Sequence, residues 1–221
     1  MTEDDDPGPA RRSDVADRFR QLFGSGDSMD RMVFFSDAVF AIAMTVLVLD
    51  LIIPEGLAPE DLETALVEAV PEFFAYALSF AVLAGAWLNH HRRFTVIRRF
   101  DSKLQWLNLL LLFFIAMLPM PTSFLSNYGS LLPWPPVLYA VVTSAVYLIL
   151  NAIWSHAWHA GLMDPQVDRT VYRYSFNSLI PVPVVFLASV PVAFWSPAAA
   201  MYMWLLLIPA GFVADRLSRR I

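Results

Sequence analysis

One apolar segment near the N-terminus constrains this chain more than any other feature. Nearly every residue between Met32 and Ile53 is apolar. An α-helix rises about 1.5 Å per residue, so this segment is long enough to cross a hydrocarbon core of about 30 Å. Its entry carries Ser36 and Asp37, and its middle carries Thr45. Polar groups at membrane depth are costly and usually face protein or water, so the segment predicts a membrane-spanning helix with a functional or anchoring side.

The apolar and polar residues of this segment separate on a helical wheel of about 100° per residue. Ile42, Val46, Leu49 and Ile53 form one narrow stripe, with Thr45 about 60° to its side. Ser36 and Asp37 point well away from that stripe. From periodicity alone, the ordinary role of such a stripe is packing against lipid or another helix. The pattern leaves open whether it lines a pore.

Asp37 and its neighbours allow three interpretations: a proton relay, an ion site or a structural cluster. Their angle away from the stripe favours the structural cluster. An ionised Asp37 needs a partner at this depth, and Arg31, His90 and Asn108 are the candidates. His90 stands next to His91, but no metal-site spacing of carboxylates and histidines accompanies the pair, so we expect no metal site.

The composition extends the membrane interpretation to the whole chain. Hydrophobic residues make up 57% of the 221 residues, against about 45–50% in ordinary soluble domains. The chain has no cysteine, which excludes disulfides and thiolate chemistry. We find no phosphate-binding glycine loop, no basic aromatic tract and no catalytic triad. The sequence therefore predicts a membrane protein that is not an enzyme, has no cofactor and does not bind nucleic acid.

Five further apolar blocks follow the first, at about 70–90, 104–124, 137–158, 172–195 and 197–214. We therefore predict an all-α integral membrane protein with six transmembrane helices. Pro181, Pro183 and Pro191 interrupt the fifth block. Prolines inside a span are tolerated where neighbouring helices satisfy the backbone, so this helix should be kinked and packed.

The positive charges predict the orientation of the six spans. All 15 Lys and Arg residues fall in the N-terminal segment up to Arg31, the loops after the second and fourth spans, and the C-terminus. Basic residues favour the cytoplasmic side, so both termini should lie inside. The outer side receives the acidic residues Glu55, Glu60, Asp61, Glu63, Glu68 and Glu72. This acidic rim either concentrates cations at an outer mouth or is an ordinary solvated loop.

The N-terminal arm, residues 1–27, differs from the transmembrane domain at 28–221. It begins with an acidic run and should be partly disordered. Val15, Phe19, Leu22 and Phe23 share one helical face. That face predicts either a short amphipathic helix on the membrane surface or a partly ordered tail.

The motif residues as a set resemble those of a known family. The run Arg31-x-x-x-Phe35-Ser36-Asp37, with Ala-Ile-Ala-x-Thr-x-Leu-x-Leu soon after it, is similar to the signature of the transmembrane protein 175 potassium-channel family. The match extends to Trp87-x-x-His90-His91 with Phe94, to Leu107-Asn108-Leu109 and to Leu118-Pro-Met-Pro-Thr122. It covers the whole length, and a single set of six helices is typical of prokaryotic members.

The resemblance implies a homotetramer whose first helices line the pore. Ile42 would form the constriction, Val46 and Leu49 would follow it, and Thr45 would contribute to selectivity. The residues that brace the pore helix would be Arg31, Phe35, Ser36, Asp37, His90 and Asn108. We therefore expect a cation channel of a prokaryotic plasma membrane that modestly favours K⁺ over Na⁺. The alternative is a secondary transporter or proton-linked carrier, for which inverted repeats would be expected, and we see no clear repeat.

Overall fold

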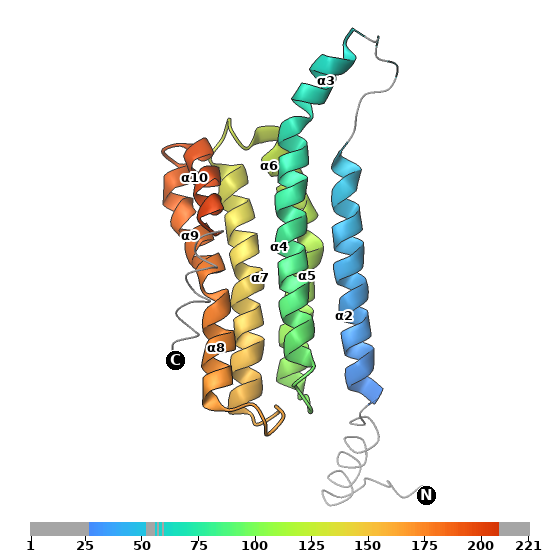
Figure 1. The fold of residues 1–221 in the computed structure, drawn as a ribbon, viewed down its shortest axis with the longest axis vertical. Helices are drawn as coiled ribbons and strands as arrows, with labels where there is room; N and C mark the ends of the chain where they lie inside the picture. The colour runs from blue at the N-terminus through green and yellow to red at the C-terminus, as the bar shows by residue number, and fades with distance from the viewer. Residues whose placement is uncertain (1–26, 52–55, 57, 59, 208–221) are drawn as a thin grey trace, which may run out of the picture.

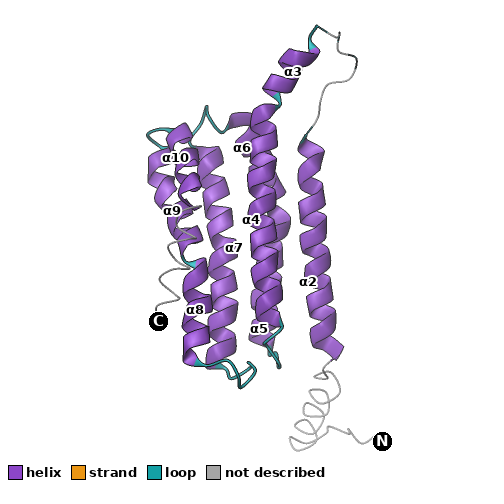
Figure 2. Cartoon of the chain, viewed as in Figure 1, coloured by secondary structure: helices purple, strands orange, loops and turns teal. Residues whose placement is uncertain are grey.

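The computed structural model describes residues 27–51, 56, 58 and 60–207, and these residues form a helical bundle (Figures 1 and 2). The amphipathic face expected at Val15–Phe23, residue Ile53 and the end of the sixth span lie outside the described residues. The helices are α2 (Asp27–Val46), α3 (Leu62–Glu68), α4 (Val70–Phe94), α5 (Ser102–Met117), α6 (Pro119–Tyr128), α7 (Trp134–His159), α8 (Arg169–Leu179), α9 (Pro181–Ala193) and α10 (Pro197–Met203), with 3₁₀ turns η1 (Leu47–Asp50) and η2 (Trp204–Leu206).

Among the described residues, five helical segments are long and apolar enough to cross a membrane. They are Met29–Leu49, Leu62–Phe94, Ser102–Tyr128, Trp134–His159 and Arg169–Ala193. Each contains the core of one of the first five predicted spans, which confirms their order. The sixth is described only as the shorter apolar helix Pro197–Leu206. The all-α class is confirmed for the part of the chain that the structure describes.

Prolines divide two of these segments into separate helices. Pro119 separates α5 from α6 and Pro181 separates α8 from α9. Proline has no N–H to donate, so the i→i−4 bond of the helix is missing at each of these positions, although Leu118 and Ile180 before them keep helical dihedral angles. Leu118 and Ile180 occupy the two breaks, and their N–H groups form tighter i→i−3 bonds to Ile115 and Asn177. The fifth predicted span is therefore interrupted at Ile180, while Pro191 remains inside α9.

Helix α7 lies at the centre of the bundle and α2 at its edge (Figure 1). In the most apolar stretch of α7, 61% of the residues are buried, whereas in the most apolar stretch of Met29–Leu49 only 22% are buried. Tyr139, Ala140 and Val146 are among the α7 side chains with no exposed surface. The chain thus covers its fourth span on several sides and leaves much of its first span uncovered.

A buried arginine joins three helices at the end of the bundle where α4 ends. The Arg93 guanidinium donates to the carbonyl oxygen of Leu150 in α7 at 3.0 Å and to that of Ser175 in α8. It also lies 5.3 Å from the centre of the Trp154 ring. Carbonyl oxygens and an aromatic face thus compensate this charge, and it holds α8 against α4 and α7.

At the same end, Asp101 stabilises the start of α5 and contacts α7. Its carboxylate accepts a bond from the Leu104 N–H at 2.8 Å and is 2.9 Å from His156 Nε2. Partial burial raises the pKa of Asp101, but the bonds from Leu104 and His156 outweigh it, so the pKa lies below the usual aspartate value. A lowered pKa means that this stabilisation is present at neutral pH and is lost as the pH falls through the folded-state value.

We expect Asp101→Asn to lower the thermal midpoint at pH 7 by a few degrees. The variant keeps the helix cap and loses the contact between the carboxylate and His156, which for a partly exposed pair is worth about 0.2–1 kcal/mol. Its midpoint should also change less than that of wild type between about pH 5 and pH 3, since aspartate has an unperturbed pKa of about 3.9. Size-exclusion chromatography after heating measures both effects.

The matched control is Asp168→Asn, because Asp168 caps α8 through the Val171 N–H at 2.8 Å. No histidine bonds to Asp168 among the described residues. Equal pH dependence in both variants would contradict a role for the Asp101–His156 contact.

Candidate pore-lining helix and its polar support

The predicted stripe of α2 is exposed to the outside of the chain. Ile42 is 62% exposed, Val46 38% and Leu49 67%. The other side of the helix packs into the bundle through Phe40, Ala43 and Leu47, which are almost fully buried. An apolar stripe that no described element covers is available to lipid or to other copies of the chain.

The end of α2 keeps this stripe straight. The α-helix ends at Val46 and continues as the 3₁₀ turn η1, Leu47–Asp50. A 3₁₀ helix has about 3 residues per turn, so Leu49 lies nearly in line with Val46 along the axis. The stripe of Ile42, Val46 and Leu49 therefore extends over the C-terminal half of the helix and its 3₁₀ turn.

Thr45 lies beside the stripe and is also exposed. Its Oγ1 donates to the carbonyl oxygen of Ile42 at 2.9 Å. Because the hydroxyl proton is used inside the helix, the oxygen lone pairs point outward and can accept a cation or a water proton. Thr45 therefore places an exposed oxygen acceptor beside the stripe, three residues after Ile42.

Three fully buried polar side chains connect α2 with α4 and α5. Asn108 Nδ2 donates to Ser36 Oγ at 2.9 Å, and Asn108 Oδ1 is 2.9 Å from His90 Nε2. Ser36 Oγ in turn donates to the carbonyl oxygen of Met32. An amide oxygen only accepts, so His90 must carry its proton on Nε2. We call Ser36, Asn108 and His90 the polar bridge.

Asp37 has a different partner from those expected. Its Oδ1 accepts a bond from Trp87 Nε1 at 2.9 Å. The candidates Arg31, His90 and Asn108 were wrong in this respect, because His90 and Asn108 bond to each other. A charged or amide partner was expected at the same depth, but the donor that faces Asp37 is the indole N–H of Trp87, one turn before His91.

The remaining motif residues lie away from the polar bridge. Phe35 is 54% exposed, and Arg31 is exposed with no hydrogen bond or ion pair to another described residue. The structure therefore brings together Ser36, Asn108 and His90, places Asp37 beside them through Trp87, and leaves Arg31 and Phe35 on the outer surface. Their role in bracing the pore helix stays a prediction.

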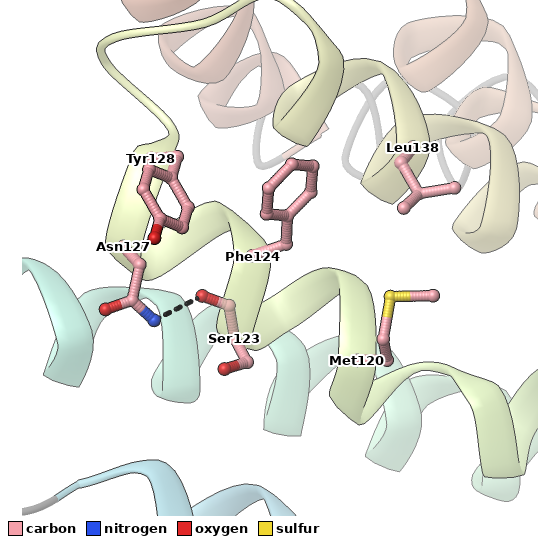
Figure 3. A pocket seen from close by; sticks show the side chains of 6 residues that line it. All are labelled: Met120, Ser123, Phe124, Asn127, Tyr128 and Leu138. Carbon is pink, nitrogen blue, oxygen red and sulfur yellow. Dashed lines mark hydrogen bonds between the residues drawn. The ribbon is translucent and has the colours of Figure 1, made fainter.

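The described residues offer no metal centre. No group of three or more His, Asp or Glu side chains is arranged to hold a metal ion within the ranges described. A groove of about 520 Å³ between α6 and α7 is mainly apolar, and Figure 3 shows Met120, Phe124 and Leu138 along it. Its Asn127 amide already donates to the Ser123 carbonyl oxygen at 2.8 Å. Membrane-length helices and an exposed apolar stripe place the chain among multi-pass membrane proteins.

Comparisons with known proteins identify the family. The model of the endosomal/lysosomal potassium channel TMEM175 matches residues 31–119. Potassium channel B446_29190 of Streptomyces collinus is 39% identical over 158 residues, which cover 67% of this chain and 77% of that protein. Potassium channel Cha6605_3372 of Chamaesiphon minutus is 34% identical over 66% of this chain and 77% of its own. The chain therefore belongs to the TMEM175 potassium-channel family, which confirms the resemblance seen in the sequence.

Solved structures agree with this assignment. The crystal structure of a lysosomal potassium-selective channel TMEM175 homolog from Chamaesiphon minutus has a TM-score of 0.73 and 27% identity, and the match covers 87% of this chain and 98% of that one. The potassium channel MtTMEM175 has a TM-score of 0.61 at 22% identity, which supports the fold alone. The human relative, an endosomal/lysosomal proton channel TMEM175, is 29% identical over 76% of this chain and 33% of its own length.

Proposed function

We propose that this protein is a potassium-selective cation channel of the plasma membrane, formed by a homotetramer with both termini inside. The exposed α2 stripe carries this proposal, because the chain leaves Ile42 and Leu49 uncovered in a family whose bacterial relatives are named potassium channels. In a ring of four copies the stripes face one another around a central axis. They then become the walls of a pore.

The ring of four Ile42 side chains is the constriction. Apolar side chains that meet at one level exclude water when the ring is narrow, and they close the pore by dewetting. An ion that passes must shed part of its hydration shell. K⁺ holds its shell less tightly than Na⁺, so the ring favours K⁺ to a modest degree. The outward lone pairs of Thr45 compensate part of this loss.

The proposed orientation is supported by where the structure gathers the basic loops. The loop after α4 and the loop after α7 meet at one end of the bundle, where Ile97 pairs with Met163 and Arg98 with Asp164 at 2.9 Å. The loop after α4 carries Arg98 and Arg99, and the loop after α7 leads into α8, whose first turns carry Arg169 and Arg173. Basic residues next to the ends of spans are typical of the cytoplasmic side. The acidic helix α3 extends from the opposite end (Figure 1).

We expect neutralising the outer acidic residues to reduce conductance only at low ionic strength. Glu60, Asp61 and Glu63 precede or begin α3 and are exposed. Replacing all three with amides should lower K⁺ current about twofold or more at about 0.01 M salt, where the Debye length is about 30 Å. At about 1 M salt, where the Debye length is about 3 Å, single-channel recording should give wild-type current. An equal reduction at both salt concentrations would contradict an electrostatic role.

Ion flux through purified protein in liposomes tests the proposed function. A K⁺ gradient should drive rapid flux, and an equal Na⁺ gradient a slower one. Slow, saturable flux that requires a counter-ion would instead indicate a secondary transporter or proton-linked carrier.

Proton conduction is a second candidate function, because the human relative is named a proton channel. A pH-sensitive dye inside the same vesicles measures it directly. Proton flux without K⁺ flux would overturn the potassium-channel proposal, while K⁺ flux that far exceeds proton flux would support it.

A further inference from the structure

A pocket of about 390 Å³ lies at the basic end of the bundle, between the first turns of α2 and the end of α4. It contains none of the stripe residues and none of the polar bridge. Its wall includes the apolar side chains of Met29, Val33 and Phe94. The membrane-length segment of α2 begins at Met29, so the pocket lies at the level where lipid headgroups meet acyl chains.

Arg98 supplies the positive charge of this pocket. Its Nε donates to Asp164 at 2.9 Å, and its side chain is nevertheless 65% exposed. That bond uses only Nε, so the two terminal NH₂ groups of the guanidinium remain, and no described residue accepts a hydrogen bond from them. A guanidinium with a pair of parallel donors is suited to bind two oxygens of a phosphate.

The pocket also contains a negative charge, which narrows the choice of ligand. Asp30 lines it from α2 and is exposed. No ion pair joins Asp30 to Arg98, so two opposite charges face one pocket without neutralising each other. A ligand with only negative charge would be repelled by Asp30. A ligand with both a phosphate and an ammonium group matches both side chains.

We propose that this pocket binds a phospholipid of the ethanolamine type from the inner leaflet. Its phosphate contacts Arg98, its ammonium contacts Asp30, and the start of one acyl chain packs against Met29 and Val33. The volume lies within the range of about 300–1,000 Å³ that is common for small-molecule sites and admits a headgroup rather than a whole lipid. A free phosphate would make no use of the apolar wall. The site therefore fits a membrane lipid.

Native mass spectrometry tests this site on the detergent-purified full chain, with phosphatidylethanolamine or phosphatidylglycerol of identical acyl chains added. Wild type should retain more phosphatidylethanolamine. Arg98→Gln should reduce that retention about five- to tenfold, as expected for loss of a charge-assisted contact. Arg99→Gln is the matched control, because it removes the same charge from the adjacent residue, whose guanidinium bonds to the Gly161 carbonyl oxygen and does not line the pocket.

Two further variants separate binding from folding and define the headgroup. Asp164→Asn removes the ion pair of Arg98 but keeps the guanidinium, so it should still retain phosphatidylethanolamine. Asp30→Asn should shift the preference toward phosphatidylglycerol. Equal losses in Arg98→Gln and Arg99→Gln would overturn the proposal, since the whole basic surface would then attract lipid. A wild type without preference, or an Asp30→Asn variant with unchanged preference, would also overturn it.

Discussion

Replacing Ile42 with asparagine should raise K⁺ conductance about tenfold or more and reduce the preference for K⁺ over Na⁺. Ile42 is 62% exposed on the outward stripe of α2, so in a tetramer its side chain has nothing from its own chain in front of it. An amide at this level hydrogen-bonds water and replaces part of the hydration that an ion loses. The free-energy cost of dehydration therefore falls for both ions. The difference between the costs for K⁺ and Na⁺, which sets the ion selectivity, falls as well.

Single-channel recording in planar bilayers measures both quantities. Leu148→Asn serves as a control, because Leu148 is also exposed, at 49%, but belongs to α7. The control should keep wild-type conductance. Unchanged currents in Ile42→Asn would show that Ile42 is not the constriction.

Replacing Asn108 with alanine should destabilise the protein more than any other single change in the polar bridge. Asn108 bonds to both Ser36 and His90 at 2.9 Å, and all three side chains are fully buried. Removing it leaves the histidine N–H without a partner and takes one of the two hydrogen bonds of the Ser36 hydroxyl, which still donates to Met32. An unsatisfied buried group costs about 1–3 kcal/mol and a lost hydrogen bond about 0.5–1.5 kcal/mol, so we expect a loss of about 2–4 kcal/mol.

Thermal denaturation followed by size-exclusion chromatography tests this expectation. Asn127→Ala is the control, since Asn127 is exposed and bonds only within α6 and should change stability little. Asp37→Ala should likewise impair folding or assembly, and Trp87→Phe should impair them less, because it removes the donor and keeps the ring. A stable Asn108→Ala tetramer with altered ion preference would contradict a bracing role and indicate a role in permeation.

Much of the fold could be predicted because membrane spans are encoded locally. A run of apolar residues identifies a span, and the helical period of Ile42, Val46 and Leu49 identifies a face. Both depend on neighbours in sequence rather than on tertiary contacts. The exposure of that face agrees with the predicted stripe. Its role as a constriction stays a prediction.

Contacts between distant residues could not be predicted in the same way. Asp37 bonds to Trp87, 50 positions away, and Arg93 bonds to Ser175, 82 positions away. A sequence shows which groups need partners at depth, but the choice among nearby donors depends on helix rotation. The break at Leu118 was also missed, although Pro119 was a visible signal for it.

Thiol modification of α2 tests the central claim that its exposed stripe lines the ion pathway. The chain has no native cysteine, so each introduced cysteine is the sole target. Silver ions should block K⁺ current through Thr45→Cys and Leu49→Cys within seconds, and leave Leu148→Cys on α7 unaffected. If silver blocks Thr45→Cys and Leu49→Cys but not Leu148→Cys, the ion pathway runs along α2. Conducting Thr45→Cys and Leu49→Cys channels that silver does not block would contradict the claim, and the stripe would then be a packing surface.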